Sequence, residues 1–216
     1  MPLKLNMTKK EIVDYLKNDL KTSVLNDVFP CLQLNNQNGG YFAVPRLVLS
    51  YVDYLGALYH GYLGRTNNNG RRIFADGRYA KAFLNDVFSI IDPNYKKHGD
   101  LLWEIYRNGT IHLYEPLKLE NKGKTIDWLV HKRSRICTVP IKINQSFVYL
   151  NSVHLVPLQC FGSLWKQPIS IDCLYKDLLC AIDEYANLIS TNSVLELKFR
   201  QVANALQTPE QTKLTW

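Results

Sequence analysis

The chain has 216 residues, of which 46% are hydrophobic and 21% charged, as is typical of one globular domain or of one domain with an appendage. No apolar run reaches the roughly 20 residues of a membrane helix, no signal-peptide core opens the chain, and the five cysteines form no Cys-x-x-Cys pair, so we expect a reduced cytoplasmic protein without structural zinc. The net charge of +7 fits a nucleic-acid partner without requiring one.

Helical periodicity organises the first part of the chain. Thr8 and Glu11 have the spacing of a capping box, and apolar residues then recur at helical spacing over residues 8–28. We expect Pro30 to end this helix. Residues 43–63 carry a wide apolar stripe and several tyrosines. We interpret these tyrosines as packing residues rather than as a base-stacking surface.

Two more helices complete the expected arrangement. Residues 76–91 repeat the apolar pattern before Asp92 and Pro93 stop it. The fourth helix is expected to begin near Asp100, as its N-cap, and to run to Pro116. Four helices joined by modest loops favour an antiparallel bundle.

The fourth helix carries the residues with the most chemical potential, Arg107 and His112. Arginine binds phosphate as a planar, permanently charged fork, and histidine can both take and give a proton near neutral pH. Together they are the minimum equipment for cleaving a phosphodiester without a metal. The simpler alternative is that Arg107 pairs with Glu104 or Glu115 and that His112 packs at a helix end.

Helix geometry limits how these residues meet. Five residues along an α-helix turn the direction by about 140°, so Arg107 and His112 do not lie side by side in one chain. Asn108 and His112 are four apart and share a face, so Asn108 is expected to orient the imidazole. A complete site then needs a long arginine reach or a second copy of the helix across a two-fold axis.

A basic stretch precedes this motif. Between residues 65 and 97 there are seven positive and three negative side chains. Arg71, Arg72 and Arg78 could guide a phosphate backbone toward Arg107. The alternative is a solvated loop and helix face.

The segment from Arg107 to Tyr114 resembles the Arg-x4-His-x-Tyr signature of HepT-type toxins in the HEPN superfamily. The resemblance covers residues 8–116 and implies a helical bundle, a metal-independent endoribonuclease, and a homodimer whose two motifs face each other. In HepT-type systems a nucleotidyltransferase partner modifies the signature tyrosine, which would make Tyr114 a control point and implies a cognate antitoxin. Many HEPN domains have lost catalysis, so a non-catalytic RNA-binding or assembly module stays open.

The expected reaction needs no cofactor or metal. The ribose 2′-hydroxyl attacks the neighbouring phosphorus while His112 takes the hydroxyl proton or protonates the leaving 5′-oxygen. Arg107 binds the phosphate and stabilises its growing charge. The products would be a 2′,3′-cyclic phosphate and a 5′-hydroxyl, as expected of a toxin or phage-defence nuclease. Tyr114 could touch the RNA.

After Pro116 the pattern changes to an alternation of apolar and polar residues. We expect a small antiparallel sheet or a pair of hairpins over residues 125–157, with turns at Asn144-Gln145 and Asn151-Ser152. The two histidines of this stretch, at positions 131 and 154, are interpreted as surface or hydrogen-bonded residues rather than ligands.

Helical spacing returns over residues 170–190 and again over 194–206. The expected fold is therefore mainly α, an antiparallel four-helix bundle with a small antiparallel β insertion and C-terminal helices. We divide it into a bundle of residues 1–116 and a second part of residues 117–216, packed together as one unit.

Overall fold

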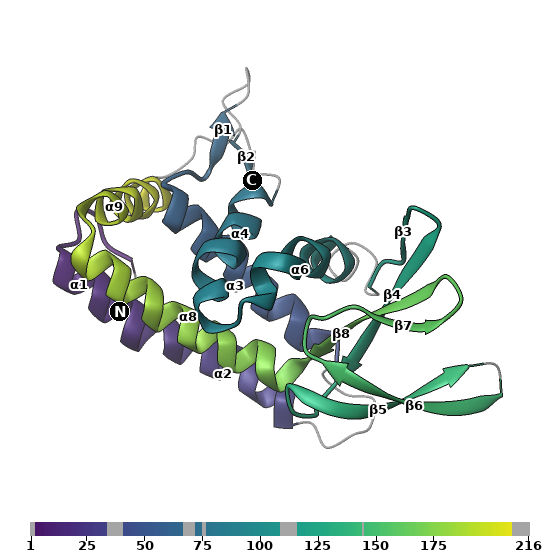
Figure 1. Ribbon diagram of the computed structural model, residues 1–216. Coiled ribbons are helices and arrows are strands. Elements are labelled where there is room, and N and C mark those ends of the chain that lie inside the picture. Colours follow the sequence, from purple (N-terminus) through teal and green to yellow (C-terminus); the bar gives the residue numbers. More distant parts are fainter. Residues whose placement is uncertain are drawn as a thin grey trace, which may run out of the picture.

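In the computed structural model the chain forms a mixed α/β fold, with the helices gathered in one body and most strands on one side of it (Figure 1). The expected order of helices, β region and C-terminal helices is confirmed at this level. The side chains of residues 65, 66, 72–74, 108 and 143 are not described. The structure describes residues 3–33, 41–66, 72–74, 77–108, 116–143 and 145–208.

The first helical run consists of α1 (Lys9–Asp14), the π-helical segment η1 (Tyr15–Leu20) and α2 (Lys21–Gln33). The capping box is confirmed, because Thr8 accepts the Glu11 amide and Glu11 accepts the Thr8 amide. The expected stop at Pro30 is wrong, since Pro30 lies inside α2. A proline removes one donor, and in the last turn this costs a single helical hydrogen bond rather than the helix.

The next helices are α3 (Ala43–His60), α4 (Arg78–Phe83), the π-helical η2 (Leu84–Phe88) and α5 (Ser89–Ile91). The fourth expected helix begins earlier than predicted, as α6 (Asn94–Leu102), and continues into the π-helical η3 (Trp103–Asn108). Asp100 is therefore an interior residue and not a cap. Asp92 instead stabilises the first turn of α6, because its Oδ1 accepts a hydrogen bond from the Asn94 amide at 2.9 Å. Proline is favoured at helix starts, so Asp92-Pro93 ends one helix and begins the next.

The C-terminal helices α8 (Ile171–Thr191) and α9 (Ser193–Gln207) pack on the N-terminal ones, and α8 runs alongside α2 (Figure 1). Ser170 caps α8 by accepting the Cys173 amide. The buried stripe of α8 joins the apolar faces of α1, α2 and α3 in one core. Within the described ranges no helix is both long and apolar enough to cross a membrane.

The main sheet has the order β3 (Leu119–Asn121), β4 (Lys124–His131), β8 (Leu164–Ser170) and β7 (Leu158–Phe161). The expectation of a wholly antiparallel sheet is wrong, because β4 and β8 pair in parallel. Alternation along one strand does not encode its partner's direction, and the chain between these two strands forms its own hairpin before it returns. A short pair, β1 (Gly64–Thr66) and β2 (Arg72–Phe74), lies apart from this sheet.

The intervening hairpin consists of β5 (Ile136–Ile143) and β6 (Ser146–Val153). Its register pairs Ile143 with Ser146, and Gln145 lies in the turn between them as predicted, whereas Asn144 lies outside the described residues. The second predicted turn, at Asn151-Ser152, is wrong because both residues belong to β6. Thr138 and Asn151 face each other across the two strands, and the Thr138 hydroxyl donates a hydrogen bond to Asn151 Oδ1 at 3.1 Å. Asn151 therefore stabilises strand pairing here, although asparagine is common in turns.

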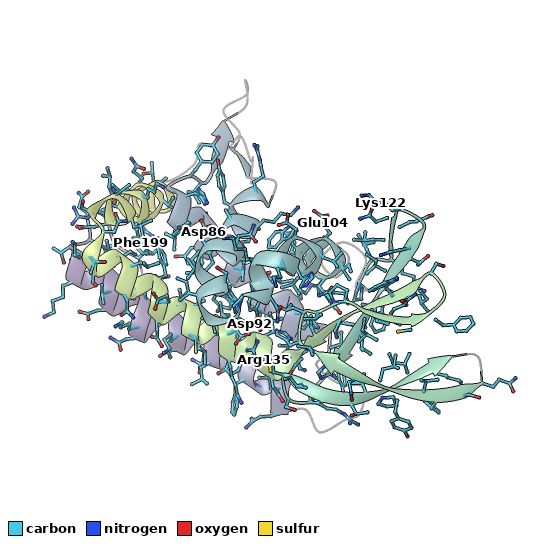
Figure 2. All side chains as sticks on the ribbon, viewed as in Figure 1. Asp86, Asp92, Glu104, Lys122, Arg135 and Phe199 are labelled. Carbon is cyan, nitrogen blue, oxygen red and sulfur yellow. The ribbon has the colours of Figure 1, made fainter. Side chains whose placement is uncertain are left out.

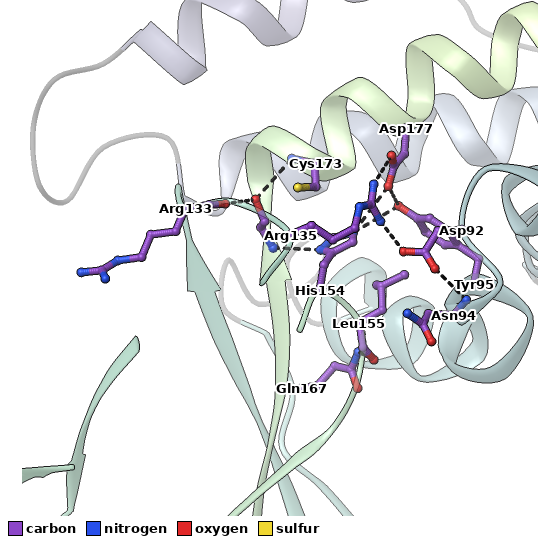
Figure 3. A network of polar contacts seen from close by, with 11 residues as sticks. Asp92, Asn94, Tyr95, Arg133, Arg135, His154, Leu155, Gln167, Cys173 and Asp177 are labelled. Atoms are coloured by element: carbon purple, nitrogen blue, oxygen red, sulfur yellow. Dashed lines mark hydrogen bonds and ion pairs between the residues drawn. The ribbon is translucent and has the colours of Figure 1, made fainter. Parts of the chain in front are cut away.

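A polar network, here called the clamp, joins this β region to the helices; its carboxylates are buried and Arg135 is partly exposed (Figure 3). Arg135, just before β5, donates to Asp92 through Nη1 and to Asp177 Oδ1 through Nη2, the latter at 2.5 Å. Tyr95 of α6 donates to Asp177 Oδ2 at 2.8 Å. Figure 2 also shows Asp92 and Arg135 together where the helical body meets the strands. The clamp thus ties the residue before β5 to α6 and α8.

His154 completes the clamp. Its Nδ1 accepts the Ser170 amide at 3.0 Å, so the neutral ring carries its proton on Nε2, which faces the Tyr95 hydroxyl at 3.3 Å. Burial, with Arg135 and His131 nearby, lowers the pKa of His154 to about 3. Burial also lowers the pKa of His131 to about 4, and this ring accepts the Arg133 amide. Both histidines are therefore neutral, hydrogen-bonded groups near pH 7.

Replacing Arg135 by Met should destabilise the fold by about 2–3 kcal/mol, because it leaves two nearly buried carboxylates without their cation; the 36% exposure of the Arg135 side chain keeps the loss below that of a fully buried pair. Asp92 and Asp177 expose only 8% and 4% of their side chains. Urea unfolding followed by circular dichroism measures the loss. The matched control is Arg133→Met, an exposed neighbour bound to the Thr138 carbonyl, which should change stability by less than about 1 kcal/mol. Equal effects of the two variants would contradict a clamp.

Stability should fall as the pH drops below 6.5. Between the ordinary histidine pKa of 6.5 and the lowered pKa of about 3, His154 is protonated only in the unfolded chain, so acid favours unfolding. The expected slope is up to about 1.4 kcal/mol per pH unit for this group. Burial raises the pKa of Asp177, which acts in the opposite sense. Urea unfolding at several pH values should therefore show a shallower slope for His154→Gln than for the wild type, and parallel slopes would refute this assignment.

Candidate functional site

Arg107, near the end of η3, is the candidate site residue that the structure describes best. Its side chain is 23% exposed and its Nη2 donates to Asp53 Oδ2 of α3 at 3.1 Å. The guanidinium carbon lies 5.5 Å from the centroid of a Trp103 ring, within cation–π range. A guanidinium has five donor hydrogens, so the hydrogen bond to Asp53 leaves others for a ligand.

Two close contacts fix this arrangement. Gly56 of α3 lies against the backbone of Tyr79, where an added Cβ would come within 2.6 Å, so α3 and α4 touch directly. Gly77 has φ +84°, and a Cβ there would approach Trp103 Nε1 to 2.5 Å. Glycine at both positions therefore lets α4 and the Trp103 ring approach closely enough to hold Arg107 beside α3.

Arg107 lines a cavity of about 350 Å³, here called the Arg107 cavity. This volume lies at the small end of the range for ligand sites. Burial raises the pKa of the Asp53 carboxyl, although Arg107 draws it down. The walls combine aromatic rings, hydroxyls and one ion pair, from Ser50, Asp53, Tyr54, Ala57, Tyr62, Leu63, Tyr79, Arg107 and Leu206. Such a lining can hold a phosphate beside a planar ring.

A larger cavity of about 600 Å³ lies between α2 and α3 and shares Ser50 and Tyr54 with the Arg107 cavity. Tyr51 donates to Asp27 Oδ2 at 2.5 Å on its wall. None of its described lining residues is basic. Its chemistry therefore favours a neutral or cationic group over a phosphate.

Most of the other predicted site residues, or their side chains, lie outside the part of the chain that the structure describes. His112, Tyr114 and Arg71 lie outside the described residues, as do the side chains of Asn108 and Arg72.

Arg78 and Leu117 are the described residues that flank the undescribed parts of the predicted site. Arg78 is exposed at the start of α4, next to Tyr79 of the cavity wall. Leu117, the second described residue after residues 109–115, donates its amide to the Ile105 carbonyl at 2.9 Å, so the chain beyond these residues is anchored beside η3.

Asp53, the partner of Arg107, was not predicted from the sequence, where Glu104 or Glu115 was the alternative partner. Glu104 binds Lys81, and Glu115 lies outside the described residues. A signal for Asp53 was present, because it is the one acidic residue between Asp27 and Asp76. A lone carboxylate on a strongly apolar helix indicates a bound cation.

A scan against models of known protein families finds no match, and searches of curated proteins and of solved structures find none either. The chemistry of the Arg107 cavity therefore rests on its own residues. In the described ranges no three His, Cys, Asp or Glu residues are grouped so as to hold a metal ion. All five cysteines are unpaired.

Replacing Asp53 by Asn should strengthen anion binding at Arg107, because it removes a carboxylate that competes for the guanidinium. A partly exposed ion pair is worth up to about 1 kcal/mol, so the affinity for uridine monophosphate should rise about fivefold in calorimetric titration. Asp86→Asn, which alters a carboxylate bound to Tyr59, should leave the affinity unchanged. An affinity that survives Arg107→Gln would show that the nucleotide binds elsewhere.

Proposed function

We propose that this protein is a metal-independent endoribonuclease in which Arg107 holds the scissile phosphate and His112 transfers protons. The observation that supports it best is the partly exposed Arg107 guanidinium, lining a cavity with aromatic and hydroxyl side chains. The net charge of +7 favours a polyanionic substrate. The resemblance of this segment to the HEPN signature supports the same reaction and a HEPN-like helical bundle.

The proposed reaction is an internal transfer. The ribose 2′-oxygen forms a bond to the neighbouring phosphorus and the bond from phosphorus to the 5′-oxygen breaks, leaving a 2′,3′-cyclic phosphate and a 5′-hydroxyl. His112 accepts the 2′-hydroxyl proton or donates one to the leaving oxygen. Arg107 stabilises the charge on the non-bridging oxygens. Asn108 orients the imidazole, and Tyr114 contacts the RNA.

Covalent geometry is compatible with a shared site. The four peptide units from Asn108 to His112 span at most about 14 Å. The hydrogen bond from Leu117 to Ile105 anchors the chain on the far side of the motif as well. The imidazole can come from the same chain or from a second copy in a homodimer, in which the two motifs face each other.

The surroundings extend the proposal. Arg71, Arg72 and Arg78 guide the RNA backbone toward the Arg107 cavity. The protein acts in the cytoplasm as a toxin or phage-defence nuclease, with a cognate antitoxin as its control partner. Neither a metal nor another cofactor takes part in the proposed reaction.

A second candidate is a non-catalytic RNA-binding or assembly module. The contact between Arg107 and Asp53 favours it, because a paired carboxylate offsets the positive charge that a reacting phosphate needs. In that case the same cavity binds RNA without cleaving it.

Labelled RNA incubated with the protein in EDTA should be cleaved to products that end in 2′,3′-cyclic phosphate. His112→Ala should lower the rate about 100-fold or more, because general acid–base catalysis contributes that much. The matched control is His98→Ala in α6, which should retain the wild-type rate with an unchanged circular dichroism spectrum. RNA bound but intact in the wild type would refute the nuclease and support the binding module.

A further inference from the structure

The hairpin of β5 and β6 presents apolar side chains that nothing in the chain covers among the described residues. Phe147 and Tyr149 are 63% and 70% exposed, and Ile136 is 69% exposed. The hairpin projects from the body on the side of the main sheet (Figure 1). We call its outer surface the aromatic face, comprising Ile136, Pro140, Lys142, Phe147 and Tyr149.

Strand register shows that these side chains share one side. Phe147 lies opposite Lys142, and Tyr149 lies opposite Pro140. Successive residues of a strand point to opposite sides, and directly opposite residues point to the same side. The other side of the hairpin holds Val139 and Ile141, which are only 2% and 5% exposed. The hairpin therefore buries one face against the protein and leaves its more aromatic face open.

The charge around the aromatic face has one sign. Residues 128–171 contain five basic residues and no acidic one. Arg135 and Lys166 are held by carboxylates of the protein, whereas Lys142 and Arg133 are exposed. A second copy of this hairpin would bring like charges together, while a polyanion would neutralise them.

We propose that the aromatic face binds single-stranded RNA, with bases stacked on Phe147 and Tyr149 and a backbone phosphate on Lys142. This inference rests on the proposed function in that RNA is the substrate. Aromatic rings beside basic groups on an open surface are the usual means of binding single strands without sequence preference. The two rings are two residues apart on one strand, about 7 Å along it, so they can take neighbouring bases.

The direct test uses a fluorescein-labelled 2′-O-methyl oligouridine of about 12 nucleotides, which lacks the attacking hydroxyl and so is bound without being cleaved. In fluorescence anisotropy, Phe147→Ala and Tyr149→Ala should each weaken binding about tenfold. Phe161→Ala is the matched control, since Phe161 is 72% exposed on β7, and it should change affinity less than about twofold. Wild-type affinity in the double variant of Phe147 and Tyr149 would overturn the proposal.

Salt dependence separates the two kinds of contact. Lys142→Gln should reduce the slope of log affinity against log salt by about 0.7, because it removes one phosphate contact to a single strand. The aromatic variants should keep the wild-type slope. Phe147→Leu, which stays apolar but loses its ring, should bind RNA as weakly as Phe147→Ala.

Two further readouts keep the outcomes distinct. If the double variant dissociates a wild-type dimer in sedimentation while RNA affinity stays unchanged, the aromatic face is a protein interface and the proposal fails. The cleavage assay is independent of this one. If the protein binds RNA through Phe147 and Tyr149 but does not cleave it, the aromatic face is supported and the nuclease is refuted. If the protein cleaves RNA and the aromatic variants bind it as tightly as the wild type, the nuclease is supported and the aromatic face is refuted.

Discussion

Arg135 lies between Asp92 and Asp177 and so joins the β region to the helical body. Burying a charged group is costly, and it is tolerated only when the charge is paired with an opposite one and its other polar atoms are hydrogen-bonded. Here Asp177 comes from α8, Asp92 from the link between α5 and α6, and the arginine from the start of the hairpin. Tyr95 adds a hydrogen bond to Asp177. Because the partners are far apart in sequence, the clamp forms only when the β region is seated on the helical body.

Both functional proposals extend from this clamp. Asp92 and Tyr95 lie at the start of α6, which continues into η3, the segment that contains Arg107. Arg135 immediately precedes β5, the first strand of the hairpin with the aromatic face. The clamp therefore fixes the beginning of the element that carries the cavity arginine and the beginning of the element that carries the aromatic rings. A substrate bound at either place meets a pre-positioned side chain, which limits the entropy lost on binding.

Periodicity in the sequence predicted most helices, including the C-terminal ones, and the alternating strands of the hairpin, because burial of one face dictates those patterns. It failed where a local signal had two physical meanings. Pro30 is tolerated near a helix end, and the alternation along β4 is equally compatible with a parallel neighbour. Ion pairs between residues far apart in the sequence could not be predicted from local patterns either. Asp53 stands out as a lone carboxylate, but its partner Arg107 is 54 residues away, and spacing along one helix pointed to Glu104 instead.

We infer that the clamp makes the β region and the helices one cooperative unit. Native-state hydrogen exchange of the Ser170 amide, bound to His154 Nδ1, measures this cooperativity. If the two parts unfold together, this amide exchanges with the same opening free energy as the interior amides of α8, such as those of Leu178 and Ile182. If Ser170 instead exchanges through an opening of much lower free energy while α8 stays protected, the β region opens separately and the clamp does not couple it to the helices.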